Sequence, residues 1–187
     1  LELPGVQFTA SHNPANYTGI KFCLADARPV TPQMLLDIAR SAFDHEAQPS
    51  PPVRVPGRVR EQDLLPAYAE HLRSLVDLSG IRPLKVVVDA GNGMAAHTVP
   101  GVLGDLPLEI VPLFCELDGS FPNHQPNPLE PENLVDAQQA VREHGADLAL
   151  VFDGDADRCF IIDETGGVVD PSAITALIAA QEIEREP

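Results

Sequence analysis

The sequence predicts an α/β fold in which helices pack on mixed or mostly parallel sheets. Short β-branched runs and helical apolar periods alternate along the second half of the chain, which is the rhythm of βαβ units. Apolar residues make up 44% of the 187 residues, enough for a packed core. We expect two α/β units, residues 1–80 and 81–187, because Gly80 and Pro83 end a helix between them.

The first unit begins with two predicted strands. Residues 6–10 alternate apolar and polar side chains, which is the period of a half-buried strand, and residues 19–24 are predicted to form a second strand. Thr31 followed by Pro32 is typical of a helix start, with a hydroxyl at the N-cap and proline at the first helical position. Apolar residues then recur at helical spacing and predict one buried face: Leu35, Ile38, Ala39 and Ala42.

Residues 44–60 interrupt this pattern. The prolines in this segment and its weak apolar periodicity predict a loop or a short edge structure. A second helix is expected to follow, with Asp63 as its N-cap. Its single apolar stripe consists of Leu65, Tyr68, Leu72, Leu75 and Val76.

The second unit alternates strands and helices. Its β-branched and apolar runs predict strands at residues 85–89, 108–113, 148–152 and 159–162. Helices are expected at residues 94–103, at residues 131–144 with Gly145 as the stop, and from Asp170 and Pro171 onward. Between them, residues 118–128 are rich in proline and asparagine and predict a long loop. Its His124 either reaches a functional site or stabilises its own turn.

The charge and the cysteine content bound the function. The chain has 12 Lys and Arg against 28 Asp and Glu, and its net charge of −16 argues against nucleic acid and anionic membrane surfaces as partners. No apolar run approaches the roughly 20 residues that span a bilayer, and no secretion signal opens the sequence. The three cysteines form no paired motif. We therefore expect a soluble, reduced, cytoplasmic protein.

A cluster of carboxylates follows the strand expected at residues 148–152. Three aspartates alternate there with two small residues and precede an arginine: Asp153, Gly154, Asp155, Ala156, Asp157 and Arg158. Crowded carboxylates repel one another, and a divalent cation with oxygen ligands relieves that repulsion. Because ligands gather at the carboxyl ends of strands in α/β sheets, the loop predicts a Mg²⁺ site.

Three other interpretations of this loop stay open. An acidic turn that faces solvent needs no metal. An EF-hand loop counted from Asp153 would place Glu164 at its last ligand position, but Arg158 stands where that loop requires glycine. A phosphatase could use an aspartate of the loop as its nucleophile, although Asp157 stands where such sites usually carry threonine.

A second polar loop follows the first expected strand. It places the hydroxyl of Ser11 on a strand-to-loop turn beside His12, Asn13 and Asn16, with Lys21 at the start of the next strand. A serine in such a turn often only caps backbone amides. A phosphoserine would instead carry up to about two negative charges, which Lys21 and a bound divalent cation would balance.

Together, the two loops resemble those of the α-D-phosphohexomutase family, which comprises phosphomannomutases and phosphoglucomutases. Residues 9–14, followed by residues 19–21, match the family's phosphoserine signature, and residues 153–158 match its metal loop. Residues 89–94 and 121–124 are similar to the second domain of the family. The resemblance covers essentially the whole chain.

The resemblance implies a Mg²⁺-dependent intramolecular phosphotransferase. Such an enzyme interconverts hexose 1-phosphate and hexose 6-phosphate through a hexose 1,6-bisphosphate. Ser11 would carry the phosphoryl group, and Mg²⁺ would be held by Ser11, Asp153, Asp155 and Asp157. Arg158 would clamp phosphoryl oxygens. His12 and Lys21 are candidates for proton transfer or charge neutralisation at the sugar hydroxyl.

The chain is shorter than the four-domain enzymes of that family. It resembles the C-terminal part of their first domain and all of their second, so the first α/β unit is expected to be incomplete. The chain ends look like cuts through a longer protein, and the missing domains of the same enzyme are expected partners. The isolated chain is therefore expected to turn over little substrate. A non-catalytic divalent-metal module and a sugar phosphatase that uses the Asp loop are the alternatives.

Overall fold

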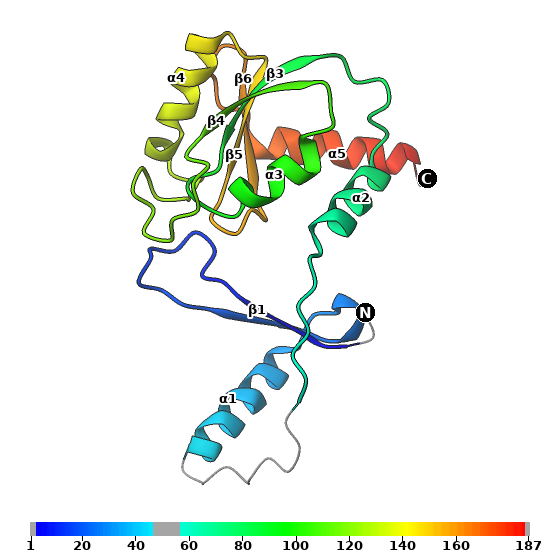
Figure 1. Ribbon diagram of the computed structural model, residues 1–187, viewed down its shortest axis with the longest axis vertical. Helices are drawn as coiled ribbons and strands as arrows, with labels where there is room; N and C mark the ends of the chain where they lie inside the picture. Colours follow the sequence, from blue (N-terminus) through cyan, green and yellow to red (C-terminus); the bar gives the residue numbers. More distant parts are fainter. Residues whose placement is uncertain (1–2, 47–56, 186–187) are drawn as a thin grey trace. The chain divides into compact units, whose positions relative to one another are not determined.

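The computed structural model describes residues 3–46 and 57–185 of the chain. Two compact units are present, one formed by residues 1–9 and 19–63 and the other by residues 10–18 and 64–187. Figure 1 shows the helices and strands of both units, which are described separately below.

The first unit contains a two-stranded sheet and a helix. β1 (Gly5–Phe8) pairs with β2 (Ile20–Cys23) in antiparallel orientation, and a short 3-10 helix, η1 (Ala25–Ala27), follows. α1 (Pro32–Glu46) then begins where Thr31 Oγ1 accepts a hydrogen bond from the Met34 amide at 3.3 Å, as expected of a hydroxyl N-cap. The predicted burial of one face of α1 is wrong, because Leu35 and Ile38 remain 41% and 40% exposed. A two-stranded sheet is too small to cover such a face.

The segment between the two units departs from the sequence expectation in two ways. The helix α1 continues to Glu46, so the predicted loop at residues 44–60 begins later, and residues 47–56 lie outside the described part of the chain. In α2 (Leu65–Leu75) the N-cap is Leu64, which makes no side-chain capping bond. The prediction of Asp63 as the cap is therefore wrong, and the helix instead starts with a proline in its first turn.

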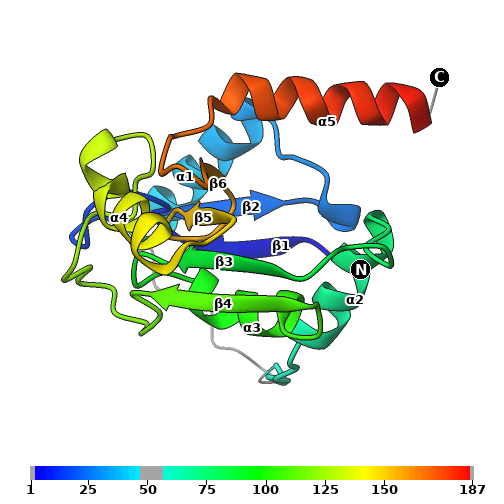
Figure 2. The same cartoon turned by 90° about the horizontal axis from the view of Figure 1, so that it is seen from above.

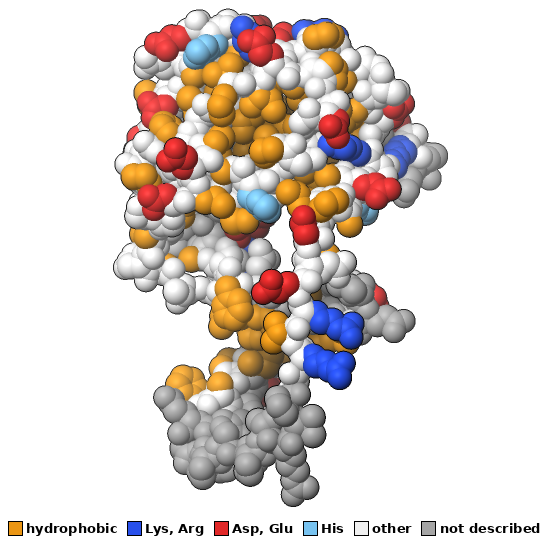
Figure 3. Space-filling view, in the orientation of Figure 1, with side chains coloured by type: hydrophobic (Ala, Val, Ile, Leu, Met, Phe, Trp, Pro, Cys, Tyr) orange, Lys and Arg blue, Asp and Glu red, His pale blue; other side chains and the backbone are white. Residues whose placement is uncertain are grey.

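Helix α2 belongs to the second compact unit, in which it packs against α3 (Ala95–Leu103). The compact units thus divide near residue 63, whereas the domain boundary at residue 80 stays a prediction from the sequence. In the space-filling view, hydrophobic side chains gather on the side of this unit that carries α3 (Figure 3).

The second unit is built on a mixed four-stranded sheet with the order β4-β3-β5-β6. Its strands are β3 (Leu84–Asp89), β4 (Leu108–Leu113), β5 (Leu148–Phe152) and β6 (Cys159–Asp163). β3 runs parallel to both β4 and β5, and Figure 2 shows β3 and β4 side by side in the same direction. Only the pairing of β6 with β5 is antiparallel. This sheet confirms the predicted α/β fold with a mixed sheet.

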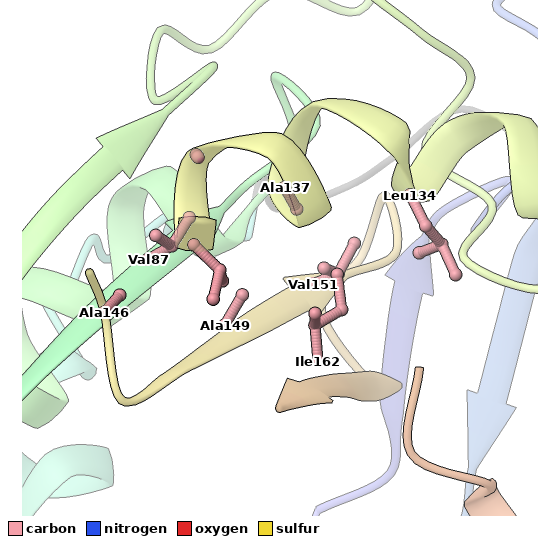
Figure 4. Close-up of a cluster of buried hydrophobic side chains, with 9 residues drawn as sticks. Val87, Leu134, Ala137, Ala146, Ala149, Val151 and Ile162 are labelled. Carbon is pink, nitrogen blue, oxygen red and sulfur yellow. The ribbon is translucent and has the colours of Figure 1, made fainter. Parts of the chain in front are cut away.

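Helices cover both faces of this sheet. On one face α4 (Val135–His144), which follows the 3-10 turn η2 (Pro131–Leu134), packs over Val87, Val151 and Ile162 (Figure 4). On the other face Val86 and Val88 pack with residues of α3, so successive valines of β3 enter opposite cores. Gly145 ends α4 with a left-handed backbone (φ 59°), as predicted. The last helix is α5 (Pro171–Arg185).

The three parallel strands determine where functional side chains can meet. β3, β4 and β5 point the same way, so the segments that follow Asp89, Leu113 and Phe152 emerge at one edge of the sheet. Residues 10–18 belong to the same compact unit as this edge. Across the described ranges, no helix has both the length and the hydropathy needed to cross a membrane.

Candidate active site and metal centre

The carboxylate loop is a tight connection between the antiparallel strands β5 and β6. The Ala156 amide donates to the Asp153 carbonyl at 3.1 Å, and Ala156 has a left-handed backbone with φ 58°. The Arg158 amide donates to Asp153 Oδ1 at 3.1 Å, so the first side chain of the loop also fastens its end. The turn curls back on itself and directs several carboxylates toward a common centre.

Asp153, Asp155 and Asp157 form a group that could hold a metal ion. Each offers a carboxylate oxygen, and these oxygens lie within 4.8 Å of one another. Asp153 is fully buried, whereas Asp157 is exposed. Hard divalent cations such as Mg²⁺ and Ca²⁺ prefer oxygen ligands of this kind, so the donor set fits such an ion.

Ser11 lies directly against this triad, although it is 142 positions from Asp153 in the sequence. Its Oγ lies 3.1 Å from Asp153 Oδ2 and 3.0 Å from Asp155 Oδ1. The backbone approaches equally closely, because a Cβ placed on Gly154 would collide with the Ser11 carbonyl oxygen. Glycine at position 154 thus permits the contact between the two loops.

Arg158 joins the serine, the histidine beside it and the carboxylates. Its Nη2 lies 2.6 Å from Asp153 Oδ2 and 3.0 Å from Ser11 Oγ, and also contacts His12 Nδ1. Its Nε lies 3.5 Å from Asp157 Oδ1. One guanidinium therefore contacts two of the three carboxylates of the triad. A divalent cation bound between such crowded carboxylates would reduce their mutual repulsion.

The structure brings together six of the seven site residues expected from the sequence. These are Ser11, His12, Asp153, Asp155, Asp157 and Arg158. The seventh, Lys21, is an exposed residue of β2 in the first compact unit, opposite Gln7. Its position relative to the triad is not determined, so its role at the site stays a prediction.

A second buried carboxylate at this edge was not predicted to take part in the site. Asp89 ends β3 and is fully buried, and its two oxygens lie 3.2 and 3.1 Å from His124 Nε2. The Gly91 amide also donates to Asp89 Oδ1, at 2.9 Å. Sequence reasoning left His124 between a site role and a turn role. The place of Asp89 at the end of a strand parallel to β5 was the available signal.

The pair changes the acid–base behaviour of the imidazole. Burial disfavours the charged form of His124, but the hydrogen bond and the negative charge of Asp89 outweigh this, so the pKa of His124 is raised above 6.5. For the nearby Cys115 thiol, whose charged form is the anion, burial raises the pKa, and the negative charge of Asp89 raises it further. The same end of the sheet therefore holds a buried histidine–aspartate pair, in which the histidine is more basic than a free one, close to the carboxylate loop.

Comparison with known families places this geometry in context. Residues 66–167 match the family model described as phosphoglucomutase/phosphomannomutase, alpha/beta/alpha domain II. Residues 3–49 match alpha/beta/alpha domain I of the same family. The two matches follow the order of the two loops along the chain.

Curated relatives and a solved structure are similar over nearly the whole chain. The sequence is 40% identical to a phosphomannomutase of Escherichia coli and 43% identical to a protein named phosphohexose mutases of Xanthomonas campestris pv. campestris, each over 98% of this chain. A phosphoglucomutase/phosphomannomutase family protein from Burkholderia thailandensis superposes with a TM-score of 0.86 at 31% identity, also over 98% of this chain.

These proteins are longer than this chain, which spans 41%, 40% and 38% of their respective lengths. The domain II match alone covers more than half of the chain, and the match to domain I precedes it. The chain therefore belongs to the phosphoglucomutase/phosphomannomutase family.

Proposed function

We propose that this chain carries the phosphoserine and metal elements of a phosphohexomutase that interconverts hexose 1-phosphate and hexose 6-phosphate. The observation that carries the proposal is the contact of Ser11 Oγ with Asp153, Asp155 and Arg158, from the other end of the chain. A serine hydroxyl among three carboxylates is suited to phosphoryl transfer only if its phosphate shares a divalent cation with them. Relatives named phosphomannomutase and phosphohexose mutases support the same assignment.

The residues that would hold the cation are Asp153, Asp155 and Asp157, with an oxygen of phosphorylated Ser11 as a further ligand. We propose Mg²⁺, because it is a hard ion that commonly combines carboxylate ligands with a phosphate oxygen. When bound, it would neutralise charge on the phosphoryl oxygens in the loose transition state. The fit rests on the oxygen donors of the triad, which lie within 4.8 Å of one another.

The side chains of this site would divide the remaining work. Ser11 Oγ gives its phosphoryl group to a sugar hydroxyl, so its O–P bond breaks while a sugar O–P bond forms. The hydroxyl proton passes to a base, for which His12 and Lys21 are the candidates. Arg158 holds phosphoryl oxygens, since its guanidinium already reaches Ser11 Oγ at 3.0 Å. The bisphosphorylated sugar then reorients and returns its other phosphoryl group to Ser11.

The experiment that tests this proposal is the phosphorylation of Ser11. The chain is incubated with glucose 1,6-bisphosphate and Mg²⁺, and intact mass and peptide mapping locate any phosphoryl group. We expect one phosphoryl group on Ser11, none in Ser11→Ala, and none when EDTA replaces Mg²⁺. Ser172→Ala removes a hydroxyl on α5 and serves as the matched control, which should be modified like the unaltered chain.

The alternatives give different results in the same experiment. A non-catalytic metal module would bind Mg²⁺ and leave Ser11 unmodified. A sugar phosphatase that uses the Asp loop would hydrolyse sugar phosphates even in Ser11→Ala. Because the chain spans about two fifths of its relatives, we propose that the missing domains supply the rest of the enzyme. Conversion of glucose 1-phosphate to glucose 6-phosphate at a rate near that of a full-length mutase would contradict this incompleteness.

The cytoplasmic location expected from the sequence stays a prediction.

A further inference from the structure

The buried pair of Asp89 and His124 is not among the groups proposed to react. The hydrogen-bond partners of the His124 ring nevertheless indicate the protonation state of that ring. His124 Nδ1 lies 2.8 Å from the Gln125 carbonyl oxygen, and Nε2 lies 3.1 Å from Asp89 Oδ2. Both neighbours are acceptors, so both ring nitrogens must donate, and only the imidazolium has two N–H groups. A neutral imidazole would lose one of the two contacts.

The surroundings of the ring favour the same state. The His124 side chain is only 9% exposed, and Phe114 packs against it edge-on with ring centroids 5.2 Å apart. The titratable groups that act on the pair are Asp136 of α4, whose charge adds to that of Asp89, and Cys115, whose thiol is kept neutral. The raised pKa of His124 means that the charged pair persists to higher pH than for a free histidine.

The loop that carries His124 leads directly to the metal loop. Pro126, two residues further on, is fully buried. A Cβ on Gly91 would lie 3.2 Å from Pro126 Cβ, and a Cβ on Gly154 would lie 3.3 Å from Pro126 Cγ. Pro126 is therefore in close contact with the turn after β3 and with Gly154, the residue between two of the three aspartates.

The opposite side of Gly154 is held as well. Its carbonyl oxygen accepts a hydrogen bond from the Met94 amide at 3.0 Å, and a Cβ on Gly93 would collide with it. Asn123 Nδ2 donates to Asn92 Oδ1 at 2.8 Å, which ties the same loop to the turn after β3 a second time. Movement of the His124 loop would thus be transmitted to Gly154 through Pro126.

We propose that Asp89 and His124 are positioning residues that hold the carboxylate loop in its cation-binding shape, and that loss of the imidazolium charge weakens divalent-cation binding at the triad. The contribution of the pair is complete below the pKa of an unfolded histidine and is lost as pH rises through the raised folded value. The inference rests on the metal site of the proposed function, but it concerns residues that touch neither cation nor substrate.

The experiment compares Mg²⁺ affinity across pH in the unaltered chain, in His124→Gln and in His144→Gln. His144→Gln removes an exposed histidine at the end of α4 and is the matched control. We expect His124→Gln to raise the Mg²⁺ dissociation constant about tenfold at pH 6, as for other residues that orient metal ligands. In the unaltered chain the dissociation constant should rise with pH, with a midpoint at the pKa of His124 measured by NMR.

His12 also contacts the site, but it is unchanged in all three proteins, so the difference between the pH profiles isolates His124. A purely structural role would weaken binding at every pH and leave the profile parallel to that of the unaltered chain, which would overturn the proposal. Equal affinity in His124→Gln and the unaltered chain would also overturn it. If His124→Gln fails to fold, the unaltered chain alone tests the proposal. The midpoint at which its Mg²⁺ dissociation constant changes with pH must then coincide with the His124 titration measured by NMR, and a different midpoint would overturn the proposal.

A second measurement separates this inference from the proposed function. Hydrogen exchange of residues 153–158 is followed in the metal-free chain, and protection factors are corrected for intrinsic exchange. Protection should fall as His124 deprotonates and should be low throughout in His124→Gln. If the unaltered chain binds no Mg²⁺, the metal site of the proposed function fails, and these protection factors alone confirm or overturn the positioning pair.

Discussion

Two buried aspartates occupy equivalent places at the ends of neighbouring parallel strands, and they are used differently. Asp89 is the last residue of β3, and Asp153 directly follows β5. Both are fully buried. Asp89 contacts the imidazole of His124 and the Gly91 amide, whereas Asp153 contacts Arg158 and lies in a group with two further carboxylates. Two equally buried carboxylates therefore have different surroundings, one with a single imidazole and the other in a cluster of carboxylates.

The difference has an energetic meaning. In a buried ion pair whose hydrogen bonds are all made, each charge is compensated. Removal of one partner leaves the other uncompensated in the interior, which lowers stability. A cluster with excess like charge is strained until a cation arrives, so neutralising one member relieves repulsion. Removal of a charge from the Asp89–His124 pair and removal of a charge from an outer member of the triad, Asp155, should therefore change stability in opposite directions.

The largest expected effect concerns the satisfied pair. Asp89→Asn should lower the free energy of unfolding by about 3 kcal/mol, because it leaves the His124 imidazolium without its counter-charge in a buried place. Urea denaturation followed by circular dichroism measures this. As a control, Asp105→Asn removes an exposed partner of Arg73 and should change stability by less than about 1 kcal/mol. If Asp89→Asn lowered the free energy of unfolding by less than about 1 kcal/mol, like the control, the pair would not be structural.

The next effect concerns the carboxylate triad. Mg²⁺ at 100 times its dissociation constant should raise the free energy of unfolding by about 2.7 kcal/mol, because only the folded loop gathers the three carboxylates. Denaturation in Mg²⁺ and in EDTA measures the difference. An unfolding midpoint that does not move with Mg²⁺ would argue for a solvated acidic turn.

The smallest expected effect is a stabilisation, opposite in sign to the effect of Asp89→Asn. In the metal-free chain, Asp155→Asn should raise the free energy of unfolding by about 1 kcal/mol, because it removes one like charge while the amide oxygen still accepts from Ser11. The same variant should lose the stabilisation by Mg²⁺. Glu164→Gln changes an exposed acid beyond β6 and serves as the control. Destabilisation of metal-free Asp155→Asn would remove the contrast between the Asp89–His124 pair and the triad.

Sequence patterns predicted the strands of the second unit well, because β-branched runs such as residues 85–89 have few alternative structures. They did not predict the direction of β6, although residues 153–158 are too short for a parallel crossover and so require an antiparallel partner. The helix expected at residues 131–144 begins instead with a 3-10 turn, η2. Boundaries of this kind depend on packing rather than on local preference.

At the candidate site too, local motifs could be predicted from the sequence, whereas contacts between distant residues could not. Ser11 and the triad could be recognised because each motif is local, and their meeting was inferred from the resemblance of the two loops to one family. The pairing of Asp89 with His124 joins residues that are 35 positions apart. Both lie in stretches that resemble the second domain of the family, but that resemblance did not indicate that the two side chains meet. Only the order of the strands in the sheet shows that the loop after β4 returns to the end of β3.

The backbone of Ser11 gives the site a cost that is separate from its charges. Ser11 adopts φ 54°, a left-handed conformation that glycine tolerates and that costs other residues about 1–2 kcal/mol. Replacement by glycine would therefore relax the turn while removing the hydroxyl. If Ser11 carries the phosphoryl group as proposed, the residue that suits the backbone of this turn and the residue that suits its chemistry are different.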